Sequence, residues 1–230
     1  MLQVIQSYQT FIFWTCLFII IALRLLSMWA FDQRVLKALP AIRFFNPNNW
    51  FVFRLLSVPA AIALTAIAFQ RGSYGHSFSN AFYGLAALYP SCLENTGRLI
   101  RKLIDSRGVF FVFALPTVAF TFAIYLLLMG ETSLLRWGYS LQAGGSALLC
   151  AGFMAMMAKT WGEESAGTWS FLLLATAWDI LLLLGVLMLY LSGQPVFGFV
   201  VFEIVILAIE LVRIVSKLGG AAKLGNLLQK

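Results

Sequence analysis

Five ionisable residues lie inside or at the ends of long apolar runs, and they are the side chains most able to carry chemistry: Arg24, Asp179, Glu203, Glu210 and Arg213. A charge in hydrocarbon is costly, so such a residue usually faces the interior of a helix bundle and marks a function or a partner. Glu203 and Glu210 are seven residues apart, which places both on one face of a helix. Arg213 follows Glu210 by three residues and can pair with it along that helix.

The depths of these charges can be counted from the turn at residues 193–195, which we expect outside the cytoplasm. With a rise of about 1.5 Å per residue, Asp179 and Glu210 lie roughly 20 Å below that turn, and Glu203 lies roughly 15 Å below it. Arg24 also falls roughly 20 Å deep in its own helix. Arg24, Asp179 and Glu210 can therefore share one layer in the inner half of a membrane.

Two interpretations of this charge cluster stay open. In the first, which we favour, the charges form an ion-paired seam that holds the first and the last two spans together. In the second, a carboxylate takes up and releases charge along a proton or cation path. Glu203 is then the best candidate, because the sequence offers it no basic neighbour at its depth.

The composition requires a membrane to position these residues. Of the 230 residues, 61% are hydrophobic and 11% are charged, whereas an average soluble domain is about half apolar and about a quarter charged. A water-soluble domain of this size cannot hide so much apolar surface in its core. We therefore predict an all-α, polytopic transmembrane helix bundle of six or seven spans that forms one domain over residues 1–230.

A spanning helix needs about 20 mostly apolar residues, and seven segments are candidates. They are residues 8–30, 50–69, 74–93, 109–129, 140–158, 169–191 and 196–215. The segment 74–93 is the doubtful one, because it carries several polar residues and a proline, and it can either span or be re-entrant. Gly219 and Gly220 are expected to end the last helix.

The basic residues orient the bundle. All of the 16 Lys and Arg residues except Arg24, Arg71 and Arg136 fall on one face if segment 74–93 crosses the membrane. Cytoplasmic loops carry the excess of positive charge. We therefore favour seven spans over six, with the N-terminus outside and the C-terminus in the cytoplasm. Compactness and short loops suggest a bacterial cytoplasmic (inner) membrane.

Residues 94–107 have the pattern of a basic amphipathic helix, with cations between apolar residues at helical spacing. Such a helix can lie in the head-group plane and contact anionic lipid on the cytoplasmic face, or it can simply extend the next span. The residues predicted to contact anionic lipid are Arg98, Arg101, Lys102 and Arg107. We expect these cations to meet lipid and not nucleic acid.

A stripe of small residues on the segment 140–158 predicts close helix packing, because small side chains at four-residue spacing let helices approach one another. Its members are Gly144, Ala147, Ala151 and Ala155. The packing partner can be another helix of the chain, a second copy or another membrane subunit.

Signatures of known catalytic and cofactor sites are missing from the sequence. There is no phosphate-binding glycine loop, no zinc-binding histidine pair and no nucleophile elbow. His76 is the only histidine, and we interpret it as a loop residue. We expect no metal and no cofactor, and we assign no catalytic residue.

Three functions remain as hypotheses, in order of preference. The first is a non-enzymatic membrane subunit that acts as a scaffold, an anchor or a pore-lining part of a larger inner-membrane assembly. The second is a small-solute or ion transporter or channel that uses Asp179, Glu203 and Glu210. The third is a lipid-modifying enzyme at the cytoplasmic face, which rests only on the basic segment 94–107.

Overall fold

The computed structural model describes residues 2–29, 50–88, 109–157 and 169–228, and these residues form helices and short turns. Within these ranges there are seven helices and no strand, which confirms the all-α class. The helices are α1 (Leu2–Trp29), α3 (Trp50–Gln70), α4 (Tyr74–Leu88), α6 (Val109–Leu127), α7 (Ser133–Met157), α8 (Trp169–Leu191) and α9 (Phe197–Leu228).

A helix lies on each of the seven apolar segments. α1 begins at Leu2 and α7 at Ser133, each before its predicted segment, and α4 covers the described part of its segment, up to Leu88. The predicted end of the last helix is wrong, because α9 continues through Gly219 and Gly220 to Leu228. A glycine inside a helix costs only about 1 kcal/mol relative to alanine, and good helix formers flank this pair. The segment 94–107 and its four basic residues lie outside the described residues.

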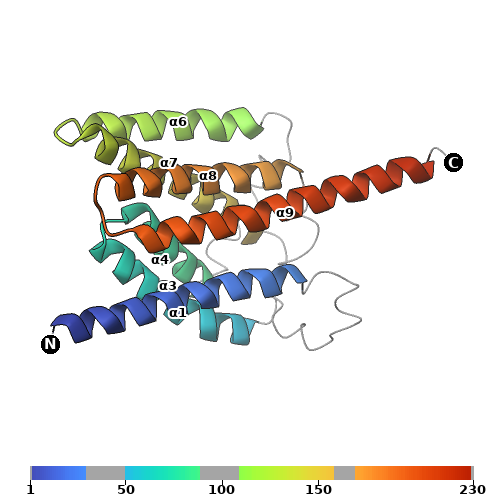
Figure 1. Cartoon of the computed structure of the whole chain (residues 1–230). Coiled ribbons are helices and arrows are strands. Elements are labelled where there is room, and N and C mark those ends of the chain that lie inside the picture. The colour runs from blue at the N-terminus through green and yellow to red at the C-terminus, as the bar shows by residue number, and fades with distance from the viewer. Residues whose placement is uncertain (1, 30–49, 89–108, 158–168, 229–230) are drawn as a thin grey trace.

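The helices alternate in direction along the chain, as Figure 1 shows. The N-terminus and the three tight turns, at residues 71–73, 128–132 and 192–196, lie at the left end of the bundle in that view, and the C-terminus lies at the right. We call the left end the turn end. α9 is the longest helix and extends past the others at the opposite end.

Two of the turns have the same construction. Gly72 and Gly193 have φ angles of 75° and 92°, which only glycine adopts readily. In each turn the amide after the glycine donates to a carbonyl five residues earlier, from Ser73 to Ala68 at 2.8 Å and from Gln194 to Leu189 at 3.0 Å. This Schellman pattern satisfies the last carbonyls of α3 and α8 and reverses the chain at once.

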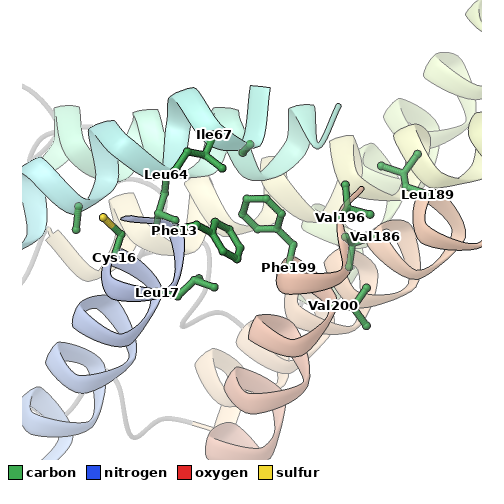
Figure 2. Packing of buried hydrophobic residues seen from close by; sticks show 12 residues of the cluster. Phe13, Cys16, Leu17, Leu64, Ile67, Val186, Leu189, Val196, Phe199 and Val200 are labelled. Atoms are coloured by element: carbon green, nitrogen blue, oxygen red, sulfur yellow. The ribbon is translucent and has the colours of Figure 1, made fainter. Parts of the chain in front are cut away.

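One apolar core joins the first helices to the last. Figure 2 shows that Phe13 of α1 and Phe199 of α9 meet at its centre, with Leu64 of α3 beside them. The two phenylalanine rings are 5.0 Å apart, edge to face, an arrangement that aromatic pairs prefer. A second cluster, around Leu182 and Trp178 of α8, packs against α7 and α6.

Many large apolar side chains lie on the outside of the bundle, while a set of polar and charged side chains is buried inside it. Phe18 of α1 is 72% exposed, Leu127 of α6 is 79% exposed and Val212 of α9 is 67% exposed. The buried polar and charged residues are Ser57, Ser73, His76, Ser77, Ser79, Thr117, Thr121, Ser140, Gln142, Ser146, Asp179, Glu203 and Glu210.

Only one stretch of the described residues, Leu173–Leu191 in α8, has both the length and the hydropathy of a membrane span. Three further apolar stretches, Gln9–Ala22, Leu55–Gln70 and Phe113–Leu127, are shorter. The crossing of a membrane by several helices therefore stays a prediction.

Candidate functional site: a buried histidine and glutamate

A close contact between ionisable side chains of distant helices joins His76 of α4 to Glu203 of α9. Nε2 of His76 lies 2.8 Å from Oε1 of Glu203, and both side chains are almost completely buried. His76 is not in a loop, as the sequence suggested, but in the first turn of α4. The tight turn at Gly72 starts α4 immediately after α3 and so brings the histidine into the bundle.

The other nitrogen of His76 is held by two polar side chains. Nδ1 lies 2.8 Å from the hydroxyl of Ser73, the residue that precedes α4, and 3.2 Å from the amide nitrogen of Gln142 in α7. Gln142 Nε2 also donates to the Ser73 hydroxyl at 2.9 Å. The Gln142 carbonyl accepts from the backbone amide of Gly75 at 3.1 Å, so one glutamine side chain satisfies an otherwise unpaired amide at the start of α4.

These contacts suit one neutral tautomer of the imidazole. An amide nitrogen only donates, and Gln142 donates to Ser73 Oγ and lies near His76 Nδ1. With the ring proton on Nε2, the lone pair of Nδ1 accepts from the Ser73 hydroxyl. The Nε2–H group then donates to Glu203, which completes a chain of hydrogen bonds from Gln142 to Glu203.

One carboxylate oxygen of Glu203 lacks a hydrogen bond. Among the described residues, Oε2 is buried and has no partner, although Oε1 is bound to His76. A buried polar atom without a partner costs about 1–3 kcal/mol, and such atoms are uncommon in native proteins. Oε2 is thus the atom of the pair that can take up a proton without losing a hydrogen bond.

Aromatic rings close the site toward α1. The Phe199 ring lies 4.7 Å from the imidazole, and Phe13 packs against the far side of Phe199. The guanidinium of Arg71 lies 4.3 Å above the Phe13 ring, in cation–π geometry. Partial burial lowers the pKa of Arg71 from its usual value. Gly198 leaves room for this stack, because a Cβ there would be 2.2 Å from Phe13.

α7 fixes α4 through further hydrogen bonds. The Ser146 hydroxyl donates to the Gly75 carbonyl at 2.9 Å and accepts from Ser79 at 3.1 Å. Gly75 has no room for a side chain, because a Cβ would lie 2.5 Å from that of Gln142. Asn80 donates to the carbonyl of His76 at 2.8 Å. These bonds hold the backbone that presents His76.

The structure describes the side chains of three of the five residues in the predicted charge cluster. Asp179 of α8, Glu203 and Glu210 of α9 are all buried. Arg24 lies in α1 and Arg213 in α9, but their side chains are outside the described part of the chain. The expectation that Glu203 has no basic neighbour at its depth is wrong, because His76 is that neighbour. The sequence could not show this, since the two residues are far apart in the chain.

Burial varies along the predicted stripe of small residues on α7. Gly144 is buried against Thr121 of α6, whereas Ala147 is exposed and Ala151 is half-buried. Ala155 lies in α7, with a side chain outside the description. A different set packs closely against α8: Gly138, Gly145 and Gly152, spaced by seven residues, face Leu189, Leu182 and Trp178.

The order Ser73, His76, Glu203 resembles a nucleophile, a base and an acid, but its surroundings do not suit nucleophilic catalysis. Ser73 is 0% exposed, so a substrate cannot reach its hydroxyl in this conformation. Ser73 follows α3 directly and caps α4, since its carbonyl accepts from the Ser77 amide at 3.0 Å. The arrangement is suited to holding and moving a proton.

No protein-family model matches this chain, and a match is also missing among curated proteins and among solved structures.

Proposed function

We propose that this chain is a polytopic protein of the bacterial inner membrane, and that it binds a proton at the His76–Glu203 pair as part of ion or solute transport. It acts without metal or cofactor, and its partners are the bilayer, anionic lipid at the cytoplasmic face and other membrane subunits or copies of itself. Nucleic acid is not among them.

The distribution of side chains supports a membrane environment. Large apolar residues such as Phe18, Leu127 and Val212 are exposed, while ionisable residues such as Asp179 and Glu210 are buried. In water this distribution would be unfavourable for solubility, because large exposed apolar patches promote association. In a bilayer it is favourable, since lipid covers the apolar faces and the charges stay inside the bundle.

Aromatic and arginine side chains at the turn end support an interfacial position for that end. Tyr125 and Trp137 pack with ring centroids 4.4 Å apart, and Arg136 lies 4.0 Å above the Tyr125 ring. Tyr74 and Tyr139 form a second pair, 5.4 Å apart. Tyrosine and tryptophan are enriched at both membrane–water interfaces.

The buried pair itself carries the functional part of the proposal. A carboxylate with one oxygen on a histidine and the other without a hydrogen bond can accept a proton without breaking the existing contact. Histidine and carboxylate groups inside membrane bundles form proton relays. A pair with only a structural role would stabilise the fold more if both oxygens of Glu203 were hydrogen-bonded, since an unpaired buried acceptor is costly.

The test is a proton-flux measurement on the purified chain in liposomes that contain a pH-sensitive dye. A potassium gradient with valinomycin supplies the driving force, and the variants are Glu203→Gln and Glu131→Gln. Glu131 is an exposed carboxylate in the turn between α6 and α7, so it receives the same chemical change away from the site. We expect Glu203→Gln to lose the flux and Glu131→Gln to keep it.

Equal flux in the two variants, or no flux through the wild-type chain, would contradict the proposal. Circular dichroism and size-exclusion profiles of both variants are the controls for folding. They matter because glutamine keeps the shape of the side chain but changes a buried contact with His76.

The second candidate function is a membrane subunit without transport, in which the polar groups only hold the helices together. The exposed small side chain of Ala147, which lies between the buried Ser146 and Leu148 of α7, favours it, because small residues allow close helix contact. Purification in mild detergent from the native membrane, followed by mass spectrometry, would identify stoichiometric partners. Partners together with a silent flux assay would favour this candidate.

A further inference from the structure

We propose that Ile206 of α9 is a hydrophobic gate between two buried proton stations, the His76–Glu203 pair and the layer that contains Glu210 and Asp179. This inference rests on the proposed function and deepens it, because it names the residue that prevents an uncontrolled proton leak.

The interior face of α9 alternates between apolar and acidic residues. From the turn end inward, the fully buried residues on this face include Phe199, Glu203, Ile206 and Glu210. Steps of three and four residues keep them on one side of the helix. Glu203 is therefore bounded by an aromatic ring on one side and an aliphatic side chain on the other.

The inner layer is shared by α8 and α9. These helices are antiparallel neighbours joined by the short turn at residues 192–196. Asp179 and Glu210 lie at nearly equal numbers of residues from that turn, which puts them at the same depth. Both are buried, so α8 and α9 each bring one carboxyl group to this layer.

A proton cannot pass directly between the two stations. Seven residues of helix separate Glu203 from Glu210 by about 10 Å along the axis, whereas a hydrogen bond joins heavy atoms only about 3 Å apart. Water molecules would have to fill the interval. Ile206 occupies the middle of it, is 1% exposed and offers no donor or acceptor.

A buried aliphatic side chain at such a position blocks conduction by excluding water. Hydrophobic constrictions gate pores and channels in this way. In the described conformation Glu203 can exchange a proton with His76 but not with the inner layer. A conformational change that moves Ile206, or brings in water, would connect the two stations.

The test compares Ile206→Ala with two matched alanine variants in the same liposome assay. Ile204 is on the same helix but 52% exposed, and Leu182 is a fully buried residue of α8 that faces Gly145 of α7. We expect Ile206→Ala to raise the passive proton leak about tenfold, equivalent to a barrier lower by ~1.4 kcal/mol. Ile204→Ala and Leu182→Ala should keep the wild-type leak.

Two further variants separate gating from loosened packing. Ile206→Leu keeps the apolar volume and should restore the low leak, and adding Glu203→Gln to Ile206→Ala should abolish the excess leak. A leak shared by Leu182→Ala, or one that persists without Glu203, would overturn the gate. If the wild-type flux depends on Glu203 but Ile206→Ala leaks no more than Ile204→Ala, the gate alone is overturned. If no flux depends on Glu203, the proposed function is overturned as well.

Discussion

Helix α7 packs against its neighbours in two different ways. Toward α8 it presents Gly138, Gly145 and Gly152, and the contact is apolar and so close that Cβ atoms would collide. Toward α4 it presents Gln142 and Ser146, and hydrogen bonds accompany a close approach at Gly75. The first interface depends on shape, whereas the second depends also on satisfied polar groups, so different substitutions should damage them.

The difference also divides the molecule by role. The glycine seam between α7 and α8 makes a fixed support, because closely packed helices have no space in which to shift. The polar interface between α7 and α4 positions His76, which reaches Glu203 of α9. The close packing of α7 on α8 therefore fixes the helix whose Gln142 and Ser146 position α4 and its His76.

The largest expected effect is at Gln142. Replacing it by leucine leaves the Gly75 amide without its partner and removes the bond to the Ser73 hydroxyl, which keeps His76 Nδ1. A buried group left unsatisfied costs about 1–3 kcal/mol. We expect Gln142→Leu to lower the thermal unfolding temperature in detergent strongly. The same change at Gln70, whose only described side-chain bond is an exposed one to Gln9, should have little effect. Equal unfolding temperatures would show that the polar interface is not structural.

The next effect is in the glycine seam. A Cβ at Gly145 would lie 2.9 Å from Leu182 Cγ and 3.0 Å from the Leu182 backbone nitrogen, so Gly145→Val should force α7 and α8 apart. Overpacking of this kind costs about 1–3 kcal/mol. Gly130 has open space around its Cα, and Gly130→Val is the control. Unfolding temperatures that fall equally in both variants would argue against a special seam.

A smaller effect is expected at Ser146. Ser146→Ala removes the hydrogen bonds to the Gly75 carbonyl and Ser79, and a single hydrogen bond contributes about 1 kcal/mol net. The variant should be slightly less stable, while the exposed Ser133→Ala should match the wild type. Chemical denaturation in detergent measures both. A loss of stability as large as that of Gln142→Leu would mean that Ser146 contributes as much to the polar interface as Gln142 does.

The smallest effect on the isolated chain is expected at Ala147, on the exposed side of α7. Ala147→Leu should change stability by less than ~0.5 kcal/mol, as surface substitutions usually do. If this side of α7 binds a second copy or another subunit, the larger side chain should weaken that assembly. Size-exclusion chromatography with light scattering measures the change. An unaltered assembly would exclude this face as the interface.

The sequence predicted helices well and contacts between them poorly. Apolar runs of about 20 residues indicate helices regardless of partners, and α8 covers the predicted segment from Trp169 to Leu191. The pairing of His76 with Glu203 needed the tight turn at Gly72, whose effect on α4 is a matter of tertiary packing. Gly219 and Gly220 do not end α9, because two weak helix formers are insufficient to end a helix when the residues on both sides of them favour it.

A signal for the glycine seam was present in the sequence. Gly138, Gly145 and Gly152 repeat at seven residues, a spacing that keeps side chains on one helix face. The four-residue pattern through Gly144 and Ala147 pointed to another side of the same helix, and spacing alone could not decide which face meets a neighbour.

The most direct test of a proton-binding His76–Glu203 pair is infrared difference spectroscopy of the chain in lipid across a pH titration. Glu203→Gln and the exposed Glu131→Gln serve as the paired variants. We predict that acidification of the wild type and of Glu131→Gln gives a band component of a buried protonated carboxyl group that is lost in Glu203→Gln, while the components of the other buried carboxyl groups, Asp179 and Glu210, remain. A difference spectrum that is the same in Glu203→Gln and in the wild type, or no buried carboxyl band in the wild type, would contradict the account.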